Sequence, residues 1–198
     1  EMCIRDRIMG TGIEYEYDGK IYHFNKAIMD DYDRTISALS NKGMTVTVII
    51  LNDWNPNRSD LIYPGTKKSS NAFYYMFNGA NEAGFEQTRA IAAFLADHYS
   101  GKDSNHGKVS NWIIGNEINN QQWNYMGSMD LTNYVKVYQQ AFRIFYTAIK
   151  STNANDRVYF SLDYNWMNEI DGKLKYGGKE IVDSFNSIAN VQGQMDWG

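Results

Sequence analysis

Residues 44–54 read Met-Thr-Val-Thr-Val-Ile-Ile-Leu-Asn-Asp-Trp, an apolar run that ends in polar and aromatic residues. The apolar part is rich in β-branched side chains and too short for a buried helix, so it predicts a strand over residues 44–51. Its nearly continuous hydrophobicity is typical of a strand that is buried on both faces, as in a parallel sheet. Residues 109–116 and 157–162 predict two more short strands, and residues from Met195 onward predict the start of another.

Helical periodicity separates these strands. Apolar residues recur at positions i, i+3, i+4 and i+7 in four segments, namely 28–39, 82–99, 131–150 and 178–189. Phe85 is among the residues of the second segment that are predicted to point inward, and Asp130 is the predicted N-cap of the third. Near the N-terminus, residues 13–24 alternate around Asp18-Gly19, which predicts a β-hairpin with a tight turn.

The alternation of strands and helices predicts a parallel sheet that is covered by helices. An open doubly wound sheet and a (β/α)8 barrel both satisfy this pattern. An open nucleotide-binding sheet should carry a glycine-rich turn after a strand, and the sequence contains neither GxGxxG nor GxxxxGK[ST]. Polar and aromatic residues follow the strands instead, which is where a barrel builds its active site. We therefore predict an α/β protein with a (β/α)8 TIM barrel, present only in part, from about its second or third strand to the start of its sixth.

The N-terminal residues 1–7 have neither the apolar segment nor the cleavage site of a signal peptide, and we expect them to be non-native. Residues 8–198 then form one partial barrel domain that is truncated at the C-terminus, because a complete barrel typically takes about 250 residues. Localisation stays open at this point. We favour a secreted or cell-surface protein if the full-length protein carries a signal peptide upstream.

The composition excludes several classes of function. The formal net charge is -4 and Lys and Arg do not cluster, which argues against a nucleic-acid partner. No apolar run approaches the roughly 20 residues of a membrane span, so no membrane insertion is expected. Cys3 is the one cysteine, which excludes an internal disulfide and a cysteine-based metal site. Since His23, His98 and His106 lie in different predicted elements without an HExxH spacing, the sequence predicts neither a metal nor a cofactor.

The clearest candidate for chemistry lies in residues 111–120, Asn-Trp-Ile-Ile-Gly-Asn-Glu-Ile-Asn-Asn, where a predicted buried strand ends in a carboxylate flanked by amides. A glutamate partly shielded from water can stay protonated near neutral pH and donate a proton to a leaving-group oxygen. Glu117 is in the position to do this. Asn116 offers an amide donor and acceptor for a sugar hydroxyl beside the bond that breaks. The alternative interpretation of Glu117 is a solvated carboxylate that caps local structure.

These residues resemble the clan A superfamily of retaining glycoside hydrolases, in which an Asn-Glu pair closes the fourth barrel strand. More narrowly, residues from about 44 to 166 look like an uncharacterised, largely bacterial family of TIM-barrel, glycosidase-like domains. The segments that carry the resemblance are TVTVIILN, NWIIGNEIN with WNYMG, AFRIFYTAIKS and RVYFSLDYNW. The resemblance implies that Glu117 is the general acid/base and that Asn116 binds the sugar 2-hydroxyl. It also implies a second carboxylate, the nucleophile, on a seventh strand beyond Gly198.

Six further residues near strand ends are candidates for substrate binding, by stacking on sugar rings or by bonding hydroxyl groups: Asn52, Trp54, Asn119, Trp123, Asp163 and Trp166. For the three tryptophans and Asp163, packing or bracing of loops is the alternative role. The sequence thus favours a glycoside hydrolase that acts on a polysaccharide or oligosaccharide by a retaining mechanism. The alternative from another class is a carbohydrate-binding barrel without catalysis. A phosphate-binding α/β enzyme is the third candidate and the one least supported, since no glycine-rich anion loop occurs.

Overall fold

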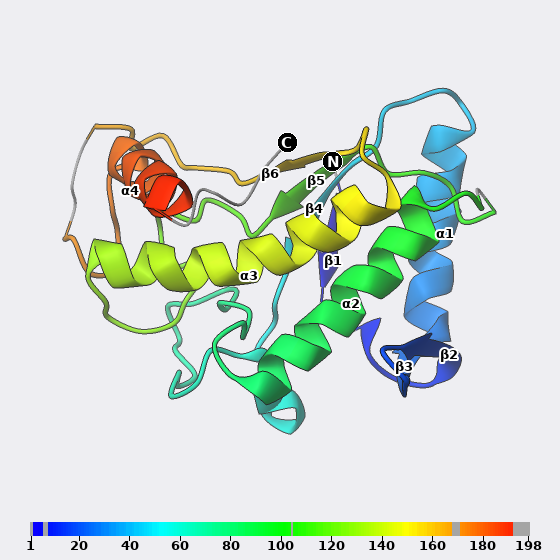
Figure 1. Cartoon of the computed structure of the whole chain (residues 1–198), viewed down its shortest axis with the longest axis horizontal. Coiled ribbons are helices and arrows are strands. Elements are labelled where there is room, and N and C mark those ends of the chain that lie inside the picture. The colour runs from blue at the N-terminus through cyan, green and yellow to red at the C-terminus, as the bar shows by residue number, and fades with distance from the viewer. Residues whose placement is uncertain (1, 6–7, 104, 168–170, 192–198) are drawn as a thin grey trace.

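The main sheet has four parallel strands in the spatial order β1-β4-β5-β6. The computed structural model describes residues 2–5, 8–103, 105–167 and 171–191 (Figure 1). The strands are β1 (Met2–Arg5), β4 (Thr47–Leu51), β5 (Asn111–Ile114) and β6 (Arg157–Tyr159). The three strands predicted inside residues 44–51, 109–116 and 157–162 are therefore confirmed, with shorter bounds. The strand predicted from Met195 onward lies outside the described residues.

The predicted TIM barrel is wrong. In the described part of the chain the parallel sheet is open, because β1 and β6 each pair with one neighbour and lie at its edges. The remaining two strands form a separate antiparallel sheet, so the arrangement has no eight-fold repeat. The prediction failed because a strand-helix alternation produces the same sequence pattern in an open sheet and in a closed barrel. Polar residues at strand ends also do not distinguish the two, since open α/β sheets place ligand sites there as well.

The predicted hairpin is confirmed as β2 (Gly12–Tyr17) and β3 (Lys20–Asn25). Asp18 and Gly19 both have positive φ, 52° and 73°, which is the backbone of a tight turn whose twist matches that of the strands it joins. On the inward side of the hairpin the ring of Phe24 is stacked on that of Phe94, with the centroids 3.7 Å apart. This contact fixes the hairpin against a helix rather than against the parallel sheet.

The predicted helices are confirmed, and most begin at a residue that caps them. Their bounds are α1 (Lys26–Ser40), α2 (Glu82–Ser100), α3 (Leu131–Thr152) and α4 (Gly178–Val191), with a short 3-10 segment η2 (Pro56–Leu61) in the long loop after β4. Asn25, Asn81 and, as predicted, Asp130 cap the first three helices by accepting a backbone N–H of the first turn. Within the described residues, none of these helices combines the length and the apolarity needed to cross a membrane.

The core lies between the sheet and the helices α2 and α3, which cross in front of the strands in Figure 1. Val48 and Ile50 of β4 and Trp112 and Ile114 of β5 are buried against it. β4 is buried on both faces, as its sequence predicts, whereas Tyr159 on the edge strand β6 is exposed. The sheet therefore presents its best-covered strands, β4 and β5, in the middle, and their carboxyl ends open onto the loops described next.

Candidate active site

The carboxyl ends of β4, β5 and β6 lie side by side at one edge of the sheet. The strands are parallel and in register, with Ile50 opposite Ile114, and the N–H of Gly115 continues the pairing by donating to the carbonyl of Ile50 at 2.9 Å. The segments that leave this edge are 52–54, 115–120 and 161–166, and they contain every candidate site residue of the sequence analysis except Trp123. In α/β sheets the crevice at the carboxyl ends of the strands is the usual place for a ligand.

Glu117 occupies an unusual backbone conformation directly after β5. Its φ is 41°, a left-handed value that only two non-glycine residues adopt in the described part of the chain. Such a conformation costs a β-carbon-bearing residue roughly 1–2 kcal/mol. Two hydrogen bonds to Ser161 hold it there: the Glu117 N–H donates to Oγ at 2.8 Å, and the Ile118 N–H donates to the carbonyl at 3.0 Å. Strain that neighbouring residues maintain at one position is a recognised mark of functional sites.

Two buried tyrosines of α3 hold both ends of the segment that carries Glu117. Tyr138 donates its hydroxyl to the carbonyl of Ile114 at 2.6 Å, and Tyr134 donates to the carbonyl of Ile118 at 2.6 Å. Tyr134 also accepts from the side-chain amide of Asn124 at 3.0 Å. Burial raises the pKa of both phenols far above the ordinary value of 10.0, so both keep the proton that they donate. The turn around Glu117 is thus fixed by α3 from one side and by Ser161 from the other.

The carboxylate of Glu117 is half-buried and forms no hydrogen bond or ion pair with any other described residue. Asn116 beside it is also half-buried, and its Oδ1 accepts a long hydrogen bond of 3.4 Å from the Ser161 hydroxyl. The backbone of this pair is therefore held in place while the Glu117 carboxylate is left for another partner.

The carboxylate of Asp163, after β6, is fully hydrogen-bonded, unlike that of Glu117. Its Oδ1 accepts from the amide of Asn119 at 2.5 Å and from the N–H of Asn165 at 2.9 Å, and its Oδ2 accepts from the Asn165 amide at 3.1 Å. Burial raises the pKa of Asp163, but these hydrogen bonds outweigh it and the net pKa is lowered. Asn119 is itself buried and also donates to the carbonyl of Tyr176 at 3.2 Å. Asp163 and Asn119 therefore brace the loops after β5 and β6 against each other.

Asn52 and Asp53, after β4, are buried at the same edge. The Asn52 amide donates to the carbonyls of Leu61 at 2.9 Å and Met76 at 3.3 Å, which fastens the long loop 52–80 across the end of the strand. Asn52 is 1% exposed and its Oδ1 has no hydrogen-bond partner among the described residues. Trp54 is half-buried, with its ring centroid 5.1 Å from that of Tyr75 in this loop.

An aromatic patch lies where loop 52–80 meets the loop after β5. The backbone N–H of Phe73 donates to the carbonyl of Gln122 at 2.8 Å, and this joins the two loops. Above that junction Trp123 packs between Phe73 and Tyr74, with ring centroids 4.9 Å and 6.1 Å away. We call Phe73, Tyr74 and Trp123 the aromatic patch. Phe73 is 55% exposed, so the patch is open to solvent.

Trp166 lies apart from these rings. It is 49% exposed, and its indole lies against Gly178 at the start of α4. No ring contact connects it with Trp54 or Trp123 among the residues that the structure describes. The three candidate tryptophans therefore lie on three separate loops rather than in one stack.

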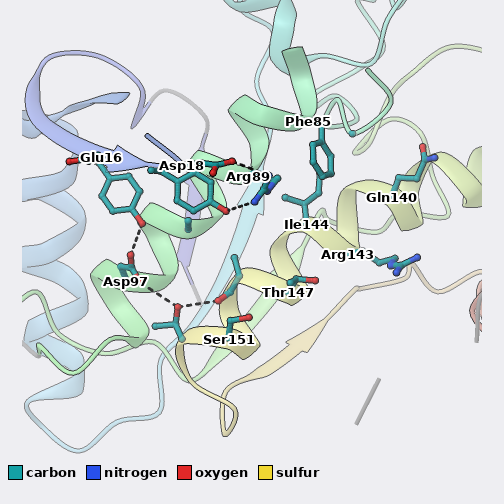
Figure 2. A pocket seen from close by; sticks show the side chains of 16 residues that line it. Glu16, Asp18, Phe85, Arg89, Asp97, Gln140, Arg143, Ile144, Thr147 and Ser151 are labelled. Atoms are coloured by element: carbon teal, nitrogen blue, oxygen red, sulfur yellow. Dashed lines mark hydrogen bonds and ion pairs between the residues drawn. The ribbon is translucent and has the colours of Figure 1, made fainter. Parts of the chain in front are cut away.

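A separate groove of about 760 Å³ lies on the helical side, between the hairpin and helices α2 and α3 (Figure 2). It contains no candidate residue of the sequence analysis. Phe85, predicted to point inward, is 41% exposed and lines this groove instead. Polar groups of the groove bond to one another: Tyr15 donates to Asp97 at 2.5 Å, and Arg89 donates to the Tyr17 hydroxyl at 3.1 Å and lies 3.6 Å from Asp18. These contacts fasten the hairpin to α2.

Sequence reasoning missed three residues that position Glu117. Tyr134 and Tyr138 were expected only as apolar positions of a helix, and the periodicity carried no information about their hydroxyl groups. Ser161 lies inside a predicted strand, 44 residues from Glu117, and no local pattern marks it as a partner.

Comparison with protein families shows to which family the chain belongs. The model of DUF5722 matches residues 1–198. The chain belongs to DUF5722, a family of unknown function. Curated proteins include no match to it. Membership in DUF5722 carries no assigned chemistry, and the comparisons give no glycosidase or barrel relationship.

Proposed function

We propose that this DUF5722 chain hydrolyses glycosidic bonds in a polysaccharide or oligosaccharide, with Glu117 as the general acid. The observation that carries the proposal is the carboxylate of Glu117, which has no partner among the described residues and lies on a left-handed backbone at the carboxyl end of β5. A carboxylate whose only role is structural is expected to cap or brace, as Asp163 does. The oxygens of Glu117 instead bond to none of the described residues, while Ser161, Tyr134 and Tyr138 hold the backbone around it.

The surroundings support a sugar rather than a charged metabolite. Asn116 provides an amide next to the carboxylate, and amides bond sugar hydroxyls as donors and as acceptors. The aromatic patch offers a ring face on which a pyranose can stack. In the proposed hydrolysis Glu117 gives its proton to the glycosidic oxygen as the bond from that oxygen to the sugar carbon breaks, and the sugar alcohol leaves. Water then supplies the hydroxyl that ends on the sugar carbon, and its other proton returns to the Glu117 carboxylate. Asp163 is not assigned the role of second carboxylate, because its two oxygens are taken by Asn119 and Asn165.

The test compares hydrolysis of a panel of aryl glycosides and soluble polysaccharides by the wild-type chain and by Glu117→Gln. The variant should lose about 10²–10⁴-fold in kcat, the contribution typical of general acid catalysis. Glu14→Gln is the matched control, because Glu14 is a surface residue of the hairpin with a side chain 74% exposed. The proposal fails if Glu117→Gln turns over as fast as Glu14→Gln.

The second candidate is a carbohydrate-binding module without catalysis. It is favoured by the same aromatic patch together with the hydrogen bonds that Asn119 and Asn165 donate to both oxygens of Asp163, which withdraw that carboxylate from a catalytic pair with Glu117. In that case wild type and Glu117→Gln bind oligosaccharides equally and neither hydrolyses them, while Trp123→Ala loses binding. Isothermal titration with the oligosaccharides of the hydrolysis panel separates the two functions.

A further inference from the structure

Asp33, His98 and His106 form a cluster where α1, the end of α2 and the loop after α2 meet, at a site that the Glu117 chemistry does not use. Asp33 belongs to α1, His98 to the last turn of α2, and His106 to the loop that follows α2. The Nε2 of His98 lies 2.8 Å from Asp33 Oδ1, and the Nδ1 of His106 lies 2.7 Å from Asp33 Oδ2. One potential ligand atom from each residue lies within 4.8 Å of the other two.

The fold holds these three side chains together by specific contacts. Gly107 brings the loop against α1: a β-carbon there would lie 2.5 Å from the backbone nitrogen of Ser37. The N–H of Lys108 then donates to the Ser40 hydroxyl at 3.2 Å, which fixes the loop on the helix. Tyr99 donates its hydroxyl to Asp33 Oδ1 at 2.8 Å and orients the carboxylate from behind, as outer groups do in metal sites.

We propose that Asp33, His98 and His106 bind a divalent transition-metal ion of the zinc class. Two imidazole nitrogens and one carboxylate oxygen are a ligand set that Zn²⁺ uses in proteins, with bonds of about 2.0–2.2 Å. A tetrahedral ion with such bonds separates its ligand atoms by roughly 3.3 Å, so each nitrogen must move about 0.5 Å away from the Asp33 oxygen that it now faces at 2.8 Å or 2.7 Å. The ion takes the place of the hydrogens that now lie between the imidazoles and the carboxylate.

The chemistry and the exposure of the cluster suit a metal ion. Asp33 supplies the carboxylate of the ligand set, and its two oxygens face His98 and His106 separately. The side chain of His98 is 10% exposed and that of His106 is 39% exposed. An ion therefore enters from the His106 side, where a water can complete four-fold coordination. Bound there, it ties α1, the end of α2 and the following loop together.

The experiment titrates Zn²⁺ into the chelator-treated, full 198-residue chain and measures binding by calorimetry. Wild type should bind one equivalent, and His98→Ala and His106→Gln should each weaken the affinity at least about tenfold. His23→Ala is the matched control, because His23 is the third histidine of the chain, exposed on the hairpin, and it should bind as wild type does. Equal binding by wild type, His98→Ala and His106→Gln, or no binding by wild type, overturns the proposal.

A second measurement avoids variants that fail to fold. Diethyl pyrocarbonate modifies accessible imidazoles, and mass spectrometry of wild type locates the modified residues. Added Zn²⁺ should protect His106 from modification while His23 reacts at an unchanged rate. Protection of neither histidine, or of both to the same degree, overturns the site.

Discussion

The hydrogen bond between Tyr138 and the carbonyl of Ile114 should make a measurable contribution to the free energy of unfolding. Tyr138 is 2% exposed and its hydroxyl lies 2.6 Å from the carbonyl oxygen, so Tyr138→Phe removes one short, buried hydrogen bond with almost no change in packing volume. A net hydrogen bond is worth about 1 kcal/mol, and leaving a buried carbonyl without its donor raises the loss to about 1–2 kcal/mol. For a chain of this length, that lowers the unfolding midpoint by about 3–6 °C.

Thermal unfolding followed by circular dichroism measures the shift, with Tyr159→Phe as the matched control. Tyr159 lies on the edge strand β6 and is 42% exposed, so removing its hydroxyl should change the free energy of unfolding by less than about 0.5 kcal/mol. Because Tyr134 holds the other end of the same segment, the double variant Tyr134→Phe/Tyr138→Phe should show a coupling of at least about 0.5 kcal/mol. The account that α3 holds the Glu117 segment is contradicted by either of two results. One is that Tyr138→Phe unfolds at the same temperature as Tyr159→Phe, and the other is that the losses of Tyr134→Phe and Tyr138→Phe simply add in the double variant.

Two further predictions concern α1 and its neighbours. Gly107→Ala should lower the free energy of unfolding in urea by about 2 kcal/mol or more, because Gly107 has a φ of 85° and the new β-carbon would collide with the α1 backbone. Gly43 has a similar φ of 75° but open space around it, so the control Gly43→Ala should lose only about 1 kcal/mol. Equal losses in the two variants would refute the close approach of Gly107 to α1. Asp33→Asn should lose stability relative to wild type at neutral pH, and the difference should shrink as the pH falls below 3.8. The reason is that the net pKa of Asp33 lies below its ordinary value of 3.8, so its stabilising effect is present above that value and is lost as the pH falls through the folded-state pKa. A difference that grows toward acid pH would contradict this assignment.

Local elements were predictable from the sequence because their signals are local. The Asp18-Gly19 turn, the Asp130 cap and the apolar run before Asn52 each depend on a few adjacent residues, and the structure confirms all three. The prediction that the sheet closes into a barrel was wrong. Closure depends on which strands are neighbours at the edges of the sheet. The pairing of β1 with β4, which defines one edge, joins residues more than 40 positions apart.

The candidate site was predictable only as a location. The position of Glu117 at a strand end follows from the pattern of residues 111–120, and the structure places it there. What distinguishes Glu117 from Asp163 is the set of hydrogen-bond partners, and these come from distant segments: Asn119 is 44 residues from Asp163. The same is true of Asp33 and His106, which are 73 residues apart and meet only because Gly107 lets a loop approach α1. Sequence spacing carries no information on such contacts.

The central claim, that Glu117 donates the proton to the leaving oxygen, is tested most directly by how its loss depends on the leaving group. Dinitrophenolate leaves without help from an acid, whereas a sugar or an unsubstituted phenol needs the proton. We expect Glu117→Gln to lose at least about 10²-fold in the rate of bond cleavage on phenyl glycosides or oligosaccharides, and far less on dinitrophenyl glycosides. An equal loss on both classes of substrate, or no loss on either, would contradict the account.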